Sequence, residues 1–221
     1  RDSSTSRGLG DVYKRQDLDQ ALLLHPEHLS AYHLIYEEDT VLWKLREQHK
    51  VEEADEDLSV SLFSTLIDRL TSEGYDHYEI SNFSLPGLYS RHNSSYWTEK
   101  KYLGCGPSAH SYNGVSRQWN VASLDTYIKG ISAGTPVFEI EELDLYTRYN
   151  DFVITRIRTE WGMPLSKLRD EFGEKLYDYC LRMAAPHLKQ GTLELVNDIL
   201  KLTRKGIFIS DGIMSDMLWT D

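Results

Sequence analysis

The stretch Ser-Arg-His-Asn-Ser-Ser-Tyr-Trp, residues 90–97, gathers side chains that could bind a metal or a flat ligand. A neutral ring nitrogen of His92 could coordinate a metal ion, including the iron of haem. The rings of Tyr96 and Trp97 could pack against a large apolar ring system. A histidine in an irregular loop, hydrogen-bonded to its neighbours, would have the same sequence, so the residue types alone leave both interpretations open.

A second candidate site is YLGCGPSAHSY, residues 102–112, where an apolar strand is expected to enter a glycine-rich turn. Gly104 and Gly106 would allow the backbone to approach a ligand closely, and the N–H groups of such a turn could hold an anion. The turn is neither a phosphate loop nor a dinucleotide fingerprint, because the Gly-Lys-Ser/Thr and the third glycine are absent. A tight turn after a buried strand is the alternative. No sequence neighbour of Cys105 would activate it, so we predict a buried structural thiol.

Composition limits the classes of protein. The chain has 221 residues and a formal net charge of −11. This acidic balance argues against nucleic acid as a partner, because phosphate backbones are held by clustered Lys and Arg. No apolar run predicts a transmembrane segment, and no signal peptide opens the chain. Two cysteines, Cys105 and Cys180, are too few for a disulfide scaffold, which predicts a cytoplasmic protein.

The first sixteen residues are predicted to be a foreign or disordered tail. They show no apolar periodicity, and SRGLGDVYKRQ at 6–16 resembles the translation of an adapter used in transposon-based sequencing. We therefore exclude 1–16 from the predicted fold and expect the chain to be a fragment of a longer protein. A genuine flexible N-terminus is the alternative interpretation.

Residues 17–120 predict alternating helices and strands, as in part of a barrel. DLDQALLLHP predicts a helix that stops at Pro26, and residues 28–37 predict a strand, an order typical of a parallel sheet. Residues 54–73 predict an amphipathic helix capped by Gly74. Further strands are expected at 77–81, 102–106 and 115–120, and irregular structure at 82–101.

Residues 121–221 predict a mainly helical domain. Helices are expected at 123–134, 144–162, 163–173, 174–191 and 203–218, a linker at 134–143, and a hairpin around Asn197-Asp198. In the second of these helices the inward side chains are expected to be Leu145, Tyr149, Phe152 and Ile157. The order is winged-helix-like. The scattered basic residues favour a structural or protein-docking role over binding to DNA.

Four motifs taken together point to a family. HLSAYHLIYEEDT, YEISNFS, RHNSSYW and YLGCGPSAHSYNGVSRQWN, in this order, resemble the C-terminal half of the HemW-type haem chaperones. These are radical S-adenosylmethionine (SAM) proteins related to the oxygen-independent coproporphyrinogen III oxidases. The resemblance runs from about residue 17 to 221. It implies an α/β fold: the remnant of a partial (β/α) radical-SAM barrel, followed by a mainly helical, winged-helix-like C-terminal domain.

The resemblance also implies functional residues. His92 would bind haem as the ligand of its iron, and Asn93, Tyr96 and Trp97 would shape the pocket. Ile35 would lie near the adenine of SAM. The glycine-rich turn would lie beside a second cofactor or substrate position, through Gly104, Gly106, Ser108 and His110.

The chain departs from the family in what it lacks. The CxxxCxxC motif of the [4Fe–4S] cluster and the glycine-rich motif that holds SAM are absent, and a cluster needs thiolates that neither cysteine supplies in that pattern. Cluster and SAM are therefore expected only in the full-length protein, and no catalytic residue is assigned here. The implied function is a haem chaperone that passes haem to an acceptor protein. The alternative is an oxygen-independent coproporphyrinogen III oxidase. Missing barrel strands would leave a sheet edge exposed.

Overall fold

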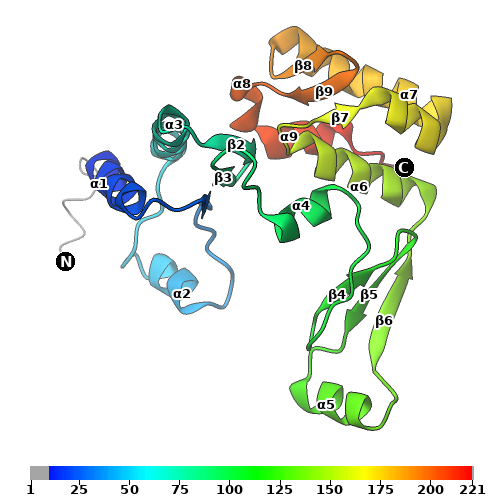
Figure 1. The fold of residues 1–221 in the computed structure, drawn as a ribbon. Coiled ribbons are helices and arrows are strands. Elements are labelled where there is room, and N and C mark those ends of the chain that lie inside the picture. Colours follow the sequence, from blue (N-terminus) through cyan, green and yellow to red (C-terminus); the bar gives the residue numbers. More distant parts are fainter. Residues whose placement is uncertain (1–9, 221) are drawn as a thin grey trace. The chain divides into compact units, whose positions relative to one another are not determined.

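The structure, a computed structural model, describes residues 10–220, and for residues 10–15 the backbone alone. The chain divides into two compact units, of which the first ends at Ser90 and the second begins at Arg91 (Figure 1). The boundary that the sequence analysis predicts between 120 and 121 lies inside the second compact unit, and as a division between domains it stays a prediction.

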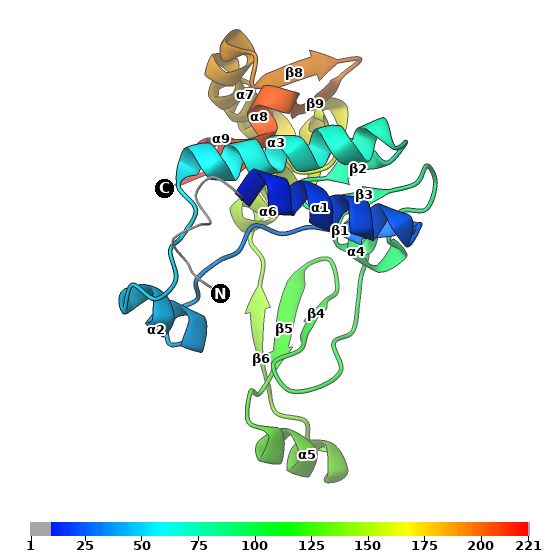
Figure 2. The same ribbon diagram turned by 90° about the vertical axis from the view of Figure 1, so that its left-hand side faces the viewer.

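The first unit packs two helices beside a small sheet. Its elements are α1 (Gly10–Leu23), β1 (His28–Ser30), α2 (Val41–Glu47), α3 (Glu56–Ser72), β2 (Asp76–Glu79) and β3 (Asn82–Ser84). The sheet has the order β1-β3-β2 with antiparallel pairs. Helices α1 and α3 lie side by side (Figures 1 and 2). Apolar side chains of α3 form the core with those of the sheet: Leu66, Ile67, Leu70, Tyr78 and Phe83.

Helix α3 confirms the prediction for 54–73, and its ends explain why it forms there. The carboxylate of Asp55 accepts a hydrogen bond from the backbone N–H of Leu58 at 2.8 Å and so caps the first turn. Gly74 follows the last turn with φ +86°, a conformation in which glycine has no steric cost. Both signals are local, which is why the sequence reveals them.

The strand predicted at 28–37 is much shorter in the structure. Only β1 is paired, and beyond the bond from the backbone N–H of Ala31 to the carbonyl of Ser81 the segment is irregular. The side chains of Tyr32 and Ile35 are 71% and 70% exposed. A strand needs a partner for its backbone groups, and high β propensity cannot replace one. The predicted parallel pairing is not formed among the described residues, whose strand pairs are all antiparallel.

The prediction of a structureless tail is wrong for residues 10–16, because α1 begins at Gly10. Once a helix has formed, each added residue gains a hydrogen bond at little cost, and no Pro interrupts the chain between Gly10 and Leu23. Residues 1–9 lie outside the described residues. The foreign origin of the segment stays a prediction.

The second unit holds the remaining elements. They are α4 (Arg91–Trp97), β4 (His110–Tyr112), β5 (Ser116–Asn120), α5 (Leu124–Ser132), β6 (Phe138–Glu142), α6 (Leu145–Ile157), β7 (Met163–Pro164), α7 (Leu165–Gln190), β8 (Leu193–Val196), β9 (Ile199–Leu202), α8 (Arg204–Ile207) and α9 (Ser210–Met217). Two antiparallel sheets have the orders β4-β5-β6 and β7-β9-β8. The first of these sheets and α5 extend away from α6, α7 and α9 of the same unit (Figures 1 and 2).

The helical part has the predicted winged-helix-like order. Tyr149, Phe152 and Ile157 are fully buried, whereas Leu145 is 39% exposed because it stands first in α6, directly after the cap residue Asp144. The predicted break at Gly173 is real, with φ 79° and ψ 172° inside α7. The predicted hairpin joins β8 to β9, and φ is positive at both Asn197 and Asp198, as a type I′ turn requires.

Three predictions for shorter segments are wrong. The expected linker at 134–143 contains β6, whose Phe138 and Ile140 alternate with glutamates at the spacing of a strand. The region 82–101, expected to be irregular, contains β3 and α4. The strand expected at 102–106 is reduced to one bridge between Tyr102 and Tyr112, because the glycine-rich turn follows at once.

Candidate functional site

The stretch RHNSSYW, residues 91–97, forms helix α4 rather than a loop. His92 and Tyr96 therefore lie one helical turn apart on its exposed side. Nε2 of His92 is 3.0 Å from the phenol oxygen of Tyr96, and the two rings meet edge to face with centroids 5.1 Å apart. The helix thus brings together two of the four residues predicted to shape a haem pocket.

The other two predicted residues of α4 have different surroundings. Trp97 is half-buried, and the guanidinium of Arg158 lies over its ring, 4.2 Å from the centroid. Its indole Nε1 is buried without a hydrogen-bond partner. Asn93 is half-buried as well. Trp97 consequently packs against the end of α6 and fixes α4 on the helical part of the unit.

A series of aromatic rings continues from His92. The ring centroids of Tyr96 and Tyr102 are 4.9 Å apart, and those of Tyr102 and Tyr112 are 6.1 Å apart. Burial raises the pKa of the phenols of Tyr102 and Tyr112 above their ordinary value, so both stay neutral at physiological pH. The side chains of His92, Tyr96, Tyr102 and Tyr112, which we call the aromatic series, thus extend from an exposed imidazole toward a cleft.

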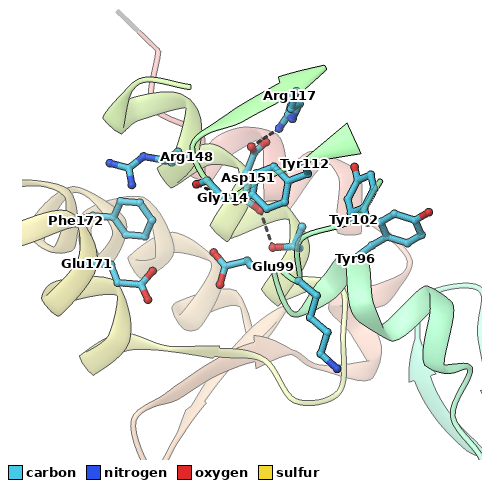
Figure 3. A pocket seen from close by; sticks show the side chains of 12 residues that line it. Tyr96, Glu99, Tyr102, Tyr112, Gly114, Arg117, Arg148, Asp151, Glu171 and Phe172 are labelled. Carbon is cyan, nitrogen blue, oxygen red and sulfur yellow. Dashed lines mark hydrogen bonds and ion pairs between the residues drawn. The ribbon is translucent and has the colours of Figure 1, made fainter. Parts of the chain in front are cut away.

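The cleft has a volume of about 520 Å³, within the range of small-molecule sites. Elements distant in sequence contribute its walls, as Figure 3 shows. It is lined by Tyr96, Glu99, Lys100, Tyr102, Tyr112, Gly114, Arg117, Arg148, Asp151, Thr155, Glu171 and Phe172. Aromatic faces and charged groups therefore occupy one concavity.

Glu99 is the most strongly held of the acidic groups that line the cleft. Its carboxylate accepts from the guanidinium of Arg156 at 2.9 Å and from the ammonium of Lys167 at 2.8 Å. Burial by itself would raise the pKa of Glu99, but the hydrogen bonds from Lys167 and Arg156 outweigh burial and hold it below its ordinary value. The group connects the end of α4 with α6 and α7.

A second ion pair lines the cleft. The guanidinium of Arg117 on β5 donates to the carboxylate of Asp151 on α6 (Figure 3). Burial raises the pKa of Asp151 above its ordinary value, and the hydrogen bond from Arg117 offsets this only in part. This pair ties the β4-β5-β6 sheet to the helical part.

Arg148 differs from the other arginine of the cleft. Among the described residues its guanidinium forms no salt bridge and no side-chain hydrogen bond, and its buried Nε has no partner. Arg148 lines the cleft together with Tyr112. A buried N–H without an acceptor is uncommon in proteins and calls for an explanation.

The backbone groups of the glycine-rich turn are hydrogen-bonded to neighbouring residues of the same unit. The backbone N–H of Gly104 donates to the hydroxyl of Ser111 at 3.0 Å, and that of Gly106 to the phenol of Tyr127 at 3.0 Å. The amide of Asn120 donates to the carbonyls of both glycines. These bonds account for the turn, and the exposed N–H groups expected there are used inside the chain. A role of Gly104 and Gly106 beside a cofactor stays a prediction.

The remaining predicted positions are spread over the chain. The backbone N–H of Ser108 donates to the carbonyl of Val121 at 3.3 Å, and His110 lies exposed beside Trp119 with ring centroids 5.9 Å apart. Ile35 belongs to the first unit and is exposed. Cofactor roles for these three residues stay predictions.

The predicted burial of Cys105 is wrong, because its thiol is free and exposed on the turn. Cys180 is fully buried inside α7, and burial raises its pKa to about 11. In the described part of the chain, no group of three or more His, Cys, Asp or Glu side chains could hold a metal ion. Each described helix also falls short of the length and apolarity that crossing a bilayer requires.

One segment of the chain matches a known domain family. Residues 143–209 match the family model of the HemN C-terminal domain. The solved structure reported as "Coproporphyrinogen III oxidase (HemN) from Escherichia coli is a Radical SAM enzyme" is similar with a TM-score of 0.69 at 18% identity, covering 90% of this chain and 50% of that one. This likeness confirms the predicted fold class.

The relatives in sequence bear another name. The heme chaperone HemW of Mycobacterium tuberculosis is 31% identical over 204 residues, which cover 92% of this chain and 50% of that protein. The heme chaperone HemW of Bacillus subtilis is 25% identical over 202 residues, covering 91% and 53%. The chain is therefore similar in sequence to the HemW proteins and in fold to HemN, and it spans about half the length of the curated relatives it matches.

The resemblance given in the sequence analysis predicts a [4Fe–4S] cluster and SAM in the full-length protein. The residues of this chain do not fit such a cluster, since Cys105 is exposed on a turn and Cys180 is enclosed in the helical core. No step of a reaction is assigned to either group here. The residues that the sequence analysis missed are Glu99, Arg117, Arg148 and Asp151. Arg148 and Asp151 share α6, whereas Glu99 follows α4 and Arg117 lies on β5, and none of the four belongs to a motif.

Proposed function

We propose that the full-length protein is a haem chaperone that binds haem through His92 and passes it to a haem-dependent acceptor protein. The observation that carries this proposal is the geometry of α4. The helix presents an imidazole on its exposed side, and among the described residues its Nε2 is hydrogen-bonded to one phenol alone, that of Tyr96. An accessible imidazole nitrogen is the group that binds haem iron. The names of the relatives support the function of a haem chaperone.

The surroundings of His92 suit a flat ligand. The aromatic series supplies ring faces and edges beside the imidazole, and such surfaces pack well against a porphyrin. Asn93 and Trp97 would contribute less directly, by fixing the orientation of α4. We place the protein in the cytoplasm, a proposal that its two free cysteines support.

The test is a titration of the chain with haem, followed by the Soret band. We expect saturable binding that His92→Ala abolishes or weakens at least tenfold, because the ligand to iron is lost. The matched control is His110→Ala, which removes an exposed histidine of the same unit and should weaken haem binding far less than His92→Ala. Equal losses in both variants, or none, would contradict the assignment of His92. Circular dichroism establishes that each variant is folded.

A second candidate is an oxygen-independent coproporphyrinogen III oxidase, which the likeness of fold to HemN favours. Such an enzyme would decarboxylate two propionates of its substrate by radical chemistry. The two candidates differ in a simple assay on the full-length protein. Turnover of coproporphyrinogen III would favour the oxidase, whereas tight haem binding without turnover would favour the chaperone.

A further inference from the structure

We propose that the cleft receives the carboxylate side chains of the porphyrin and that Arg148 is their counter-ion. This inference rests on the proposed function, since it assigns the second end of the ligand that His92 would hold at its iron. It concerns charged groups on α6 and α7, outside the motif of α4. Three observations carry it: the state of the charges in the cleft, the buried Nε of Arg148, and the direction of the aromatic series.

The charges of the cleft are almost all satisfied within the chain. Arg117 is paired with Asp151, and Glu99 binds two cations at once. Glu171 lies 3.4 Å from Lys167. Arg148 is the exception among the arginines that line the cleft, because the described residues offer it no carboxylate at salt-bridge distance. The flexible ammonium of Lys100 also lines the cleft, but it is exposed to solvent.

The guanidinium of Arg148 is suited to a carboxylate from outside the chain. Its planar fork can donate two parallel hydrogen bonds to one carboxylate, and its buried Nε has no acceptor at present. Phe172 lines the same end of the cleft and lowers the local polarity (Figure 3). A carboxylate bound there would satisfy the N–H group and form a partly desolvated ion pair, which is stronger than one in water.

The aromatic series makes the ligand class specific. Its rings extend from His92 to Tyr112, and Tyr112 and Arg148 both line the cleft. An imidazole, a series of phenol rings and an unpaired guanidinium therefore follow one another. Haem offers matching groups in the same order: iron, a flat apolar ring and two propionates. A small anion such as phosphate would use Arg148 without the aromatic wall.

The experiment compares haem with its dimethyl ester, in which both propionates are neutral. Each ligand is titrated into the wild-type chain and into Arg148→Gln, Arg148→Lys, His92→Ala and the control Arg182→Gln. Arg182 is an exposed arginine of α7 outside the cleft. Thermal unfolding verifies that every variant keeps its fold. The ratio of the two affinities reports the carboxylates, because the iron and the ring are the same in both ligands.

We expect the wild-type chain to bind haem about tenfold more tightly than the diester, the magnitude of one charge-assisted contact. Arg148→Gln should remove this preference by weakening haem alone, Arg148→Lys should restore part of it, and Arg182→Gln should retain it. If Arg148→Gln still binds haem more tightly than the diester, the inference about Arg148 is overturned. The proposed function is upheld in that case as long as haem binding is lost in His92→Ala. Binding that ignores His92, or no saturable binding, would reject both.

Discussion

The phenol oxygen of Tyr96 lies 3.0 Å from Nε2 of His92, one turn further along α4. This hydrogen bond occupies the nitrogen that would have to face the iron of a haem. The bond is exposed and joins neighbours on one helix, so breaking it requires only a rotation of the tyrosine side chain. The pair therefore has the properties of a ligand that is covered by a partner until haem arrives.

Replacement of Tyr96 by Phe tests this relationship. The variant keeps the ring in the aromatic series but loses the hydroxyl. Nε2 of His92 can then bind the iron without first giving up a hydrogen bond. We expect haem affinity to rise about fivefold, the worth of one ordinary hydrogen bond. The measurement is the Soret titration, with Tyr177→Phe on α7 as the control. Weaker binding in Tyr96→Phe would instead mean that the phenol supports the bound state.

The elements that the sequence predicted well are those set by local chemistry. Helix α3 is bounded by a capping Asp55 and by Gly74, and the hairpin at Asn197-Asp198 needs two positive φ values that these residue types tolerate. Gly173 interrupts α7 for a similar reason. In each case the residues that decide the structure are adjacent in sequence.

The elements that the sequence predicted wrongly depend on residues that are distant in sequence. Helix α4 contains two serines and an asparagine, which are poor helix formers, and it is held by Trp97 against Arg158 and by Glu99 against α6 and α7. The segment after Ser30 stays unpaired because propensity cannot supply a partner strand. His92 could be named from its motif. The cleft could not, since Glu99 and Arg117 meet Arg148 and Asp151 of α6 only through the fold.

Glu99 is expected to hold α4 in place, and Glu99→Gln tests that role. A neutral amide leaves Arg156 and Lys167 without their shared carboxylate, and Arg156 is largely buried. We expect a loss of about 2 kcal/mol in the free energy of unfolding at pH 7, below the cost for a fully buried pair. Urea unfolding measures the loss. Glu171→Gln, which removes an exposed partner of the same lysine, should cost less than about 0.5 kcal/mol.

The pH dependence follows from the direction of the shift. The pKa of Glu99 in the folded chain lies below its ordinary value of 4.5. Its contribution to stability is therefore complete above pH 4.5 and is lost as the pH falls through the lower, folded-state pKa. The difference in stability between wild type and Glu99→Gln should stay constant from pH 7 to about pH 5 and shrink below pH 4.5. A difference that grows on acidification would contradict the assignment.

Gly104 is predicted to be indispensable for the turn, whatever its role in the full-length protein. A Cβ at this position would collide with the backbone carbonyl oxygen of His110 and lie 2.8 Å from the carbonyl carbon of Ala109. Backbone cannot move aside cheaply, so Gly104→Ala should destabilise the second unit by about 2 kcal/mol. Gly212→Ala is the control, because nothing lies within 4 Å of its added Cβ in helix α9. It should be neutral or stabilise by about 0.5 kcal/mol. Equal midpoints of thermal unfolding for the two variants would refute the steric argument.

The two thiols should differ sharply in reactivity, which reports directly on the fold of the second unit. Cys105 is exposed on the turn, whereas burial raises the pKa of Cys180 to about 11 and also shields it from reagents. At pH 8 we expect an aromatic disulfide reagent to modify one thiol rapidly in the native chain and two in denaturant. Cys105→Ser should abolish the rapid phase, and Cys180→Ser should leave it intact. A rapid reaction in Cys105→Ser would mean that α7 opens readily, and the helical core around Tyr149 would then be less stable than its complete burial implies.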